Sequence, residues 1–295
     1  MYHEPAAPAC ACRRESTWLI VEGPVSLVDR IVRHVARSRV LARVFPEPID
    51  ALPVTAIAGV TLVQLAIFIA IDDWRWTLVA VGLLFPLQLN FAGMCHNHHH
   101  RHTFRRPLAN RLFEIAMFFQ LGMLPYGYTL HHNIGHHRHY RDQRVDSNRW
   151  RRPDGSVMGA WEFAVRLCLA MYPTVWRIGR RHPTVFRKFR RMTALCAALL
   201  AVAFAIDPVS AFLVWVLPLP FALVLQAQAT YHQHAGLEHA DPLRASRSVT
   251  DRGYNLRTLN LGYHTAHHLK PSLHWSKLPA FHAEIAATIP PDLID

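Results

Sequence analysis

Residues 260–279 read N-L-G-Y-H-T-A-H-H-L-K-P-S-L-H-W-S-K-L-P, and the rest of the chain is organised around this stretch. His264, His267 and His268 stand at positions i, i+3 and i+4, so on a helix their side chains share one face. On that face the adjacent His267 and His268 can each reach a different metal ion, while His264 supports one of them. The pattern indicates a metal site.

Three further histidine clusters support this interpretation. They lie at 96–102, 131–139 and 231–239, and together with 264–268 they contain 16 of the 21 histidines in the chain. Histidines that serve only as surface or core residues would be scattered more evenly. The four clusters therefore predict one shared site.

The first cluster, H-N-H-H-H-R-H, offers two ways to place a pair of imidazoles on one helix face. Either His96 with His100 or His98 with His102 stands at i, i+4. Spacing alone does not choose between the two pairs.

The second cluster places His132, His136 and His137 at i, i+4 and i+5, which again offers neighbouring rings to two metals, and His232 and His234 follow the last apolar block. Imidazole suits zinc, copper, iron and nickel, so the ligand type does not identify the metal. The number of ligands is more informative. A catalytic zinc usually keeps three protein ligands, whereas two metals ~3.5–4 Å apart can share eight or nine imidazoles.

Acidic residues near the clusters could orient the rings by accepting hydrogen bonds from them. The candidates are Asp142, Asp146, Glu238 and Asp251. For His139, His239 and His274, which lie beside the clusters, both a ligand role and an ordinary packed or surface role are left open.

Composition points to a membrane protein. Hydrophobic residues make up 51% of the 295 residues and charged residues 18%, and the apolar residues gather in blocks almost free of charge. The net charge of +12 comes from arginines that flank these blocks, as the positive-inside rule describes, which disfavours nucleic-acid binding. The five cysteines form no pattern like a disulfide framework, which indicates a reducing compartment.

The apolar blocks predict two hairpins of spanning helices. Residues 51–71 and 76–95 form the first, and residues 192–206 and 209–229 form the second, whose first arm is short for a span. Both turns carry acids, whereas arginines gather at the opposite ends, so both termini are expected in the cytoplasm. We expect an all-α membrane protein with about four transmembrane helices and a cytoplasmic helical cap that carries a histidine-rich di-metal site.

The chain is expected to divide into three parts. Residues 1–17 are predicted to be a disordered tail, residues 18–50 an interfacial amphipathic segment, and residues 51–295 one membrane domain with its cap. Within this domain, residues 113–128 are too interrupted by glycine and proline for a secure span and are predicted to be buried or re-entrant. Residues 161–189 have the pattern of surface-bound amphipathic helices.

The clusters resemble those of the membrane-bound di-iron desaturase and hydroxylase superfamily, which has three histidine boxes. Residues 96–100 resemble the first box, H-x3-H, although Asn97 stands where an acid is usual. Residues 132–137 resemble the second, H-N-x-x-H-H, and residues 263–268, Y-H-T-A-H-H, closely resemble the third. Residues 231–237 resemble the N-Y-x-x-H-x-G-L motif of the alkane hydroxylase branch, with threonine where that branch has asparagine.

The resemblance covers about residues 50–280 and implies a cytoplasmic di-iron site. The implied iron ligands are nine histidines: His96, His100, His132, His136, His137, His234, His264, His267 and His268. The resemblance also implies O2 as oxidant and electrons from an external donor of the ferredoxin, rubredoxin or cytochrome b5 type. No haem-binding or flavin-binding stretch is visible in the sequence.

The sequence favours an oxygen-dependent desaturase that introduces a double bond into a fatty acyl chain. The alternative is a hydroxylase, or monooxygenase, that acts on an alkyl or acyl chain at the same centre. A histidine-rich metal transporter is disfavoured. A transport path would need ionisable residues inside the spans, whereas residues 51–71 and 209–229 contain no charged residue and no histidine.

The expected partners are the lipid bilayer, an electron-transfer protein, and a fatty acyl substrate linked to CoA, a carrier protein or a lipid. Six arginines would suit an anionic head or an acidic carrier: Arg138, Arg141, Arg144, Arg149, Arg151 and Arg152. The expected location is the bacterial inner membrane, with the active site facing the cytoplasm.

Overall fold

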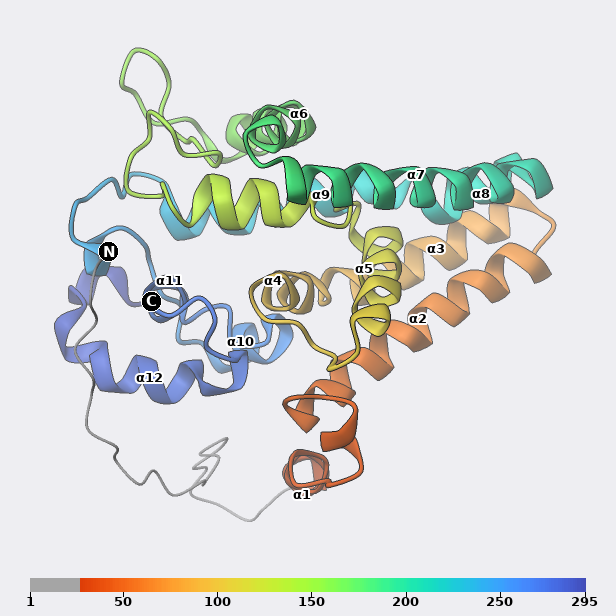
Figure 1. The fold of residues 1–295 in the computed structure, drawn as a ribbon, viewed down its shortest axis with the longest axis horizontal. Coiled ribbons are helices and arrows are strands. Elements are labelled where there is room, and N and C mark those ends of the chain that lie inside the picture. The colour runs from red at the N-terminus through yellow and green to blue at the C-terminus, as the bar shows by residue number, and fades with distance from the viewer. Residues whose placement is uncertain (1–26) are drawn as a thin grey trace.

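The structure is a computed structural model that describes residues 27–295. Over this range it consists of helices, and only isolated bridges take the place of strands. The predicted tail, 1–17, lies outside the described residues, and the predicted amphipathic segment is described only from α1 (Leu27–Ala36) onward. Figure 1 shows a long arm of helices that extends from a broader region, where the C-terminal helices gather.

The first hairpin is formed by α2 (Ala51–Ala70) and α3 (Trp74–Leu89). Asp73 caps α3, because its side chain accepts a hydrogen bond from the backbone N–H of Arg75 at 2.8 Å. The chain then bends by 45° into α4 (Ala92–His100). The predicted return span is therefore two helices, and the second carries the first histidine cluster.

The next elements lie between the two hairpins. Helix α5 (Pro107–Leu121) ends at Gly122, whose φ of 78° lies in the left-handed region that favours glycine. A π-helix, η3 (Thr129–His136), and the long α6 (Ala160–Arg181) follow. Much of α5 is buried, as predicted for this segment.

The second hairpin consists of α7 (Pro183–Ile206), α8 (Pro208–Trp215) and α9 (Pro218–His234). The predicted start of its first arm at residue 192 is wrong, because the helix already begins at Pro183, a residue favoured at the first helical position. The helix therefore extends beyond its apolar part through residues 187–191, four of which are arginine or lysine. Such long side chains can reach water from the end of a spanning helix.

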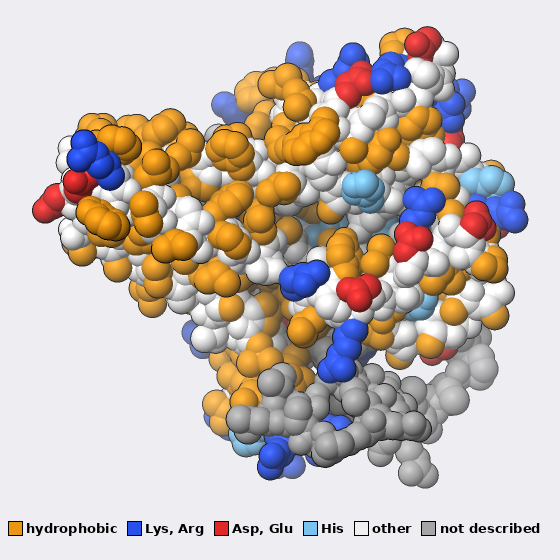
Figure 2. Space-filling view, turned by 180° about the vertical axis from the view of Figure 1, so that it is seen from behind, with side chains coloured by type: hydrophobic (Ala, Val, Ile, Leu, Met, Phe, Trp, Pro, Cys, Tyr) orange, Lys and Arg blue, Asp and Glu red, His pale blue; other side chains and the backbone are white. Residues whose placement is uncertain are grey.

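Three helical segments are long and apolar enough to cross a membrane: Pro48–Ala70, Pro183–Ile206 and Pro208–His234. Helices α3 and α4 together form a fourth if the bent pair counts as one span. Both hairpin turns lie at the far end of the arm in Figure 1. Figure 2 shows apolar side chains over this arm, with charged residues at its tip. The chain is therefore an integral membrane protein with three or four spans.

A buried network of glutamines joins the helices of the arm, and we call it the glutamine network. Gln120 on α5 donates from Nε2 to Gln64 Oε1 on α2 at 2.6 Å and accepts at Oε1 from Gln88 Nε2 on α3 at 2.9 Å. Gln64 donates in turn to the carbonyl of Val214 on α8 at 3.4 Å. Polar side chains in apolar surroundings hold helices together when they bond one another.

The C-terminal region folds back over the end of the arm that carries the histidines. It contains α10 (Arg252–Thr258), α11 (His264–Leu269) and α12 (Leu278–Ile285). Buried Asp50, at the start of α2, accepts hydrogen bonds from Trp275 Nε1 at 2.8 Å and from His274 Nε2 at 3.0 Å. These contacts tie the last part of the chain to the first spanning helix.

Short 3-10 turns connect several of these elements. They are η1 (Leu41–Arg43), η2 (Pro48–Asp50), η4 (Pro242–Arg244), η5 (Trp275–Lys277), η6 (Ala286–Thr288) and η7 (Pro291–Leu293).

Candidate metal centre

Nine histidines from four regions of the chain converge at the base of the arm. They are His96 and His100 on α4, His132 and His136 on η3, His137 directly after it, His234 at the end of α9, and His264, His267 and His268 on α11. These are the nine side chains that the resemblance implied as ligands. The structure brings them together, and their binding of metal stays a prediction.

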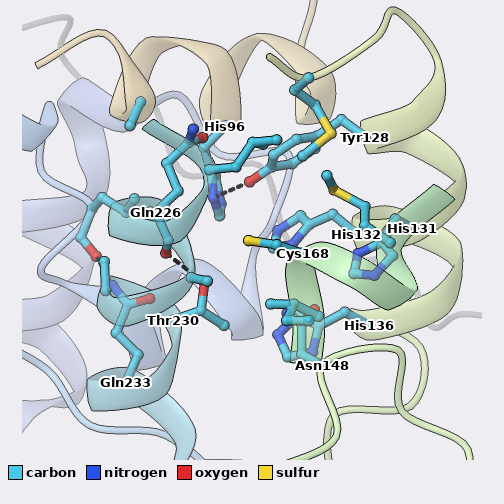
Figure 3. A pocket seen from close by; sticks show the side chains of 18 of the residues that line it. His96, Tyr128, His131, His132, His136, Asn148, Cys168, Gln226, Thr230 and Gln233 are labelled. Atoms are coloured by element: carbon cyan, nitrogen blue, oxygen red, sulfur yellow. Dashed lines mark hydrogen bonds between the residues drawn. The ribbon is translucent and has the colours of Figure 1, made fainter. Parts of the chain in front are cut away.

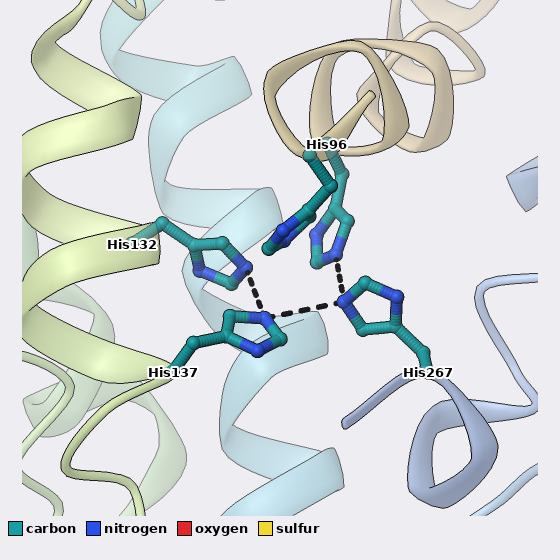
Figure 4. Close-up of side chains that lie close together, drawn as sticks. His96, His132, His137 and His267 are labelled. Atoms are coloured by element: carbon teal, nitrogen blue, oxygen red, sulfur yellow. Dashed lines mark hydrogen bonds between the residues drawn. The ribbon is translucent and has the colours of Figure 1, made fainter. Parts of the chain in front are cut away.

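Five of these histidines form a first group, made of His96, His100, His132, His137 and His267. One ring nitrogen from each lies within 4.8 Å of the others. His267 Nε2 lies 2.8 Å from His96 Nε2 and 3.2 Å from His137 Nε2, as Figure 4 shows. His137 Nε2 also lies 3.0 Å from His132 Nε2. The five rings therefore point their nitrogens at one small volume.

The other four form a second group, made of His136, His234, His264 and His268. His234 Nε2 lies 3.2 Å from His136 Nε2, 3.1 Å from His268 Nε2 and 2.8 Å from His264 Nε2. The two groups adjoin, because the ring of His137 stacks on that of His268 with a centroid distance of 4.2 Å.

The π-helix explains how the second cluster serves both groups. The backbone N–H of His137 donates to the carbonyl of His132 at 2.8 Å, five residues back. This wider turn brings His132 and His137 to the same face, whereas an α-helix would point them apart. His136 is consequently left to face the second group. On α11, His267 belongs to the first group and His268 to the second, so the two adjacent rings face different groups as the spacing allowed. His264, whose group the spacing left open, belongs to the second.

Hydrogen bonds at Nδ1 fix the orientation of several rings. His136 Nδ1 lies 2.9 Å from Oδ1 of buried Asp146, and His234 Nδ1 lies 3.1 Å from the carbonyl of Ala245. Each of these two rings thus donates from Nδ1, and in the neutral form of such a ring the lone pair is on Nε2. His96 Nδ1 lies 2.8 Å from the hydroxyl of buried Tyr128.

This tautomer leaves a specific conflict in the second group. Nε2 of His136 and Nε2 of His234 face each other across 3.2 Å, and with both rings neutral their two lone pairs would repel. A metal ion that accepts both would remove the repulsion. Two nitrogens bound about 2.1 Å from one ion at a right angle lie about 3.0 Å apart, which matches the observed spacing. The residues present therefore fit a metal ion.

The protonation of α11 agrees with this fit. Burial lowers the pKa of His267 to about 3 and holds the pKa values of His264 and His268 well below the ordinary value. The three rings are thus neutral at pH 7, and each has a lone pair to offer.

The structure also separates the two pairings that the spacing of the first cluster left open. His98 Nδ1 bonds to the hydroxyl of Thr103 at 2.8 Å, and its Nε2 lies 3.5 Å from Glu114 Oε1. His102 is exposed. The His98 and His102 pair thus lies away from both groups, and α4 presents His96 and His100 to the first.

A cavity of about 90 Å³ reaches both groups of histidines. His96 and His132 of the first group and His136 and His264 of the second line it, together with Tyr128. Figure 3 shows His132 and His136 on the side of the cavity opposite Gln226, Thr230 and Gln233 of α9. Other parts of its wall are apolar and include Met123, Met171 and Leu223. Such a wall suits a hydrocarbon chain.

A family model of fatty acid desaturases matches residues 74–294, which is well over half of the chain. The chain belongs to the fatty acid desaturase family. The predicted resemblance is therefore confirmed, and membership makes the protein an oxidoreductase of fatty acyl chains. Comparisons with curated proteins and with solved structures gave no match.

The basic surface expected to receive the head of a desaturase substrate is partly neutralised. Of the six arginines, Arg144 pairs with Asp142 at 2.7 Å, Arg151 pairs with Glu238 at 2.9 Å, and Arg152 pairs with Glu162. These ion pairs leave less positive charge for an anionic head than the sequence suggested.

The remaining candidates fall outside the histidine groups. His274 bonds to Asp50, as described above, and His139 and His239 are exposed. Among the four acids proposed to orient ligands, only Asp146 contacts one of the nine rings, because Asp142 and Glu238 pair with arginines and Asp251 caps α10.

Sequence reasoning missed Tyr128 and the Ala245 carbonyl. Tyr128 lies in a segment that was examined only for its apolar character, and its position four residues before His132 was the available signal. No sequence feature marks a backbone carbonyl as an acceptor.

Proposed function

We propose that this protein oxidises a fatty acyl chain with O2 at two histidine-bound iron ions, using electrons from a separate donor protein, and that the product carries a new double bond. Family membership supports the acyl substrate and the oxidoreductase class. The two adjoining groups of histidines support a two-metal centre. Iron and copper are the imidazole-binding metals that react with O2, and the resemblance of the histidine motifs to the di-iron superfamily favours iron.

One observation carries the metal part of this proposal. His136 and His234 both direct Nδ1 at an oxygen acceptor and turn Nε2 toward each other at 3.2 Å. A structural role for the two rings would favour one donor facing one acceptor. The first group would hold one ion and the second group the other.

Bound iron would supply the activation of O2 that removal of hydrogen from an unactivated C–H bond requires. The chain's own residues do the rest. Asp146 and the Ala245 carbonyl hold the lone pairs of two rings toward the centre. The apolar wall around Met123, Met171 and Leu223 places hydrocarbon beside the histidines and limits water there.

Hydroxylation is the alternative outcome. The third histidine motif, with Leu269 to Pro279 after it, resembles the acyl desaturases more than the alkane hydroxylases, whereas residues 231–237 resemble the hydroxylase branch. Both reactions begin with removal of one hydrogen, and a displacement of ~1 Å can change a rate by ~10²-fold, so the position of the bound chain decides the outcome.

Mass spectrometry of lipids from cells that express the protein tests the reaction. We expect acyl products that have lost two hydrogens. Products that instead gain one oxygen atom, labelled when the cells receive 18O2, would establish the hydroxylase. The purified protein should contain two iron ions per chain, and an active preparation filled with zinc would refute the iron.

We also propose that the site faces the cytoplasm of a bacterial inner membrane. The acidic turns of both hairpins lie at the end of the arm opposite the histidines, and arginines flank the other ends. In intact cells, a membrane-impermeant thiol reagent should label Asp72→Cys and leave Ser272→Cys unlabelled. Labelling of Ser272→Cys from outside would refute this orientation.

A further inference from the structure

One wall of the cavity is polar along a single face of α9. Gln226, Thr230 and Gln233 stand at i, i+4 and i+7 and line the cavity, as Figure 3 shows. At 1.5 Å per residue this stripe is about 10 Å long. It begins one turn after Leu223 and ends beside His234. A saturated hydrocarbon needs no polar wall, and burying one costs free energy.

The hydrogen bonds of this stripe leave acceptors rather than donors free. Gln226 Nε2 donates to the carbonyls of Leu121 at 3.3 Å and Ala222 at 3.1 Å, which fixes the amide and leaves Oε1 without a donor among the described residues. Thr230 Oγ1 donates to the carbonyl of Gln226 at 3.3 Å, so only its lone pairs remain. The wall therefore matches a ligand group that donates a hydrogen bond.

The opposite wall adds a buried ring that is not one of the nine. His131 lines the cavity, only 5% of it is exposed, and its Nε2 has no partner among the described residues. The residues that line the cavity include no lysine, arginine, aspartate or glutamate. A charged carboxylate would thus lack a counter-ion here, whereas an uncharged polar group would find hydrogen bonds on both walls.

We propose that the acyl chain bound in this cavity carries a hydroxyl group close to the carbon that is oxidised. The hydroxyl would donate to Gln226 Oε1 or Thr230 Oγ1 and meet His131 from the other side, while the chain lies along the apolar wall. This inference rests on the proposed function, because it assumes an acyl substrate. An amide N–H shares the donor chemistry, but it brings a carbonyl that the wall of acceptors would not match.

Competition binding to the purified full-length protein in lipid nanodiscs tests the proposal without turnover. The probes are hexadecanoic acid, a set of hexadecanoic acids with one hydroxyl at successive positions, and hexadecanamide, each displacing radiolabelled hexadecanoic acid. We expect a hydroxyl at one position or at neighbouring positions to tighten binding roughly tenfold, the scale of one satisfied hydrogen bond. Preference for the amide over every hydroxy acid would overturn the choice of hydroxyl.

Matched variants locate the preference. Gln226→Leu and the nearly isosteric Thr230→Val should each reduce the hydroxyl preference and leave the affinity for hexadecanoic acid within about threefold. Gln228→Leu is the control, because Gln228 lies on the same helix but does not line the cavity, and it should keep the preference. A preference that survives both test variants would overturn the assignment to this wall.

The outcomes also separate this inference from the proposed function. If hexadecanoic acid binds and no hydroxyl improves its affinity, the polar wall serves ordered water, and only this inference fails. If the label shows no saturable binding, this inference fails, whereas the proposed function is decided separately by the lipid products of cells that express the protein.

Discussion

The glutamine network and the two histidine groups both bury polar side chains contributed by several helices, yet they are satisfied in opposite ways. Gln120 gives a donor to one glutamine and an acceptor to another, so most of the polar atoms of this network meet within the protein. His136 and His234 instead point one ring nitrogen at another. Burial of polar groups is common to both regions, and only the histidine groups turn ring nitrogens toward one another in an arrangement that fits a metal ion.

The largest expected effect comes from removing one ring of the second histidine group. His234→Ala removes a ring that contacts three other members of its group, and we expect loss of one metal ion per chain and a fall in activity of more than about 100-fold, beyond the usual effect of an outer partner. Elemental analysis and product formation measure both. The control is His102→Ala, which should retain both ions. A His234→Ala protein with two ions would refute the second group as a metal site.

A smaller effect is expected when the ring stays and only its orientation is released. Asp146→Ala removes the carboxylate at His136 Nδ1 and should weaken metal binding by about 10–100-fold, as loss of such partners typically does. Asp146→Asn keeps an oxygen acceptor and should lose less. Competition with a chelator gives the affinities, and equal affinities in all three proteins would remove the orienting role.

Substitutions in the glutamine network should change the stability of the protein rather than its metal content. Gln120→Leu removes the donor to Gln64 Oε1 and the acceptor of Gln88 Nε2 and should cost about 1–3 kcal/mol of unfolding free energy. Replacing all three glutamines by leucine should cost less than this single change, because no glutamine is then left with an unsatisfied atom and only the Val214 carbonyl loses a donor. Denaturant unfolding in detergent measures both variants. Loss of metal from Gln120→Leu would show that the two regions are coupled.

The smallest expected effect is that of Tyr128→Phe. The change removes one neutral hydroxyl at His96 Nδ1, and a neutral hydrogen bond contributes only about 0.5–1.5 kcal/mol. We expect metal affinity to fall by less than about tenfold. A loss as large as that of His234→Ala would mean that Tyr128 acts on the centre directly.

Local spacing predicted the site well wherever the helix was regular. On α11, the adjacent positions of His267 and His268 sufficed to direct them to different groups, but the spacing did not assign His264. Spacing was not sufficient for the first cluster, because Thr103 and Glu114 hold His98 away from the site, and these contacts depend on how α4 packs on α5. The division of the second cluster also depends on a π-helix, which no spacing rule for α-helices describes.

The sequence also predicted the main elements of the fold but not their exact bounds or contacts. Apolar blocks located both hairpins, but hydrophobicity placed the start of α7 at residue 192, where the lipid-facing part begins, instead of at Pro183. The glutamines in the blocks are visible in the sequence, but their pairing depends on which helices become neighbours. Domain boundaries and the ligand roles of the nine histidines stay predictions.

The contacts of Asp50 with the C-terminal region constrain the order in which the protein assembles during synthesis. Asp50 is separated by 224 residues from His274 and by 225 from Trp275, so a growing chain places it in the membrane long before its partners exist. When α9 has been synthesised, six of the nine histidines are present, and the three on α11 follow later. Assembly of the complete centre is therefore among the last events of biosynthesis, and a chain truncated before residue 264 would insert its spans without ever completing it.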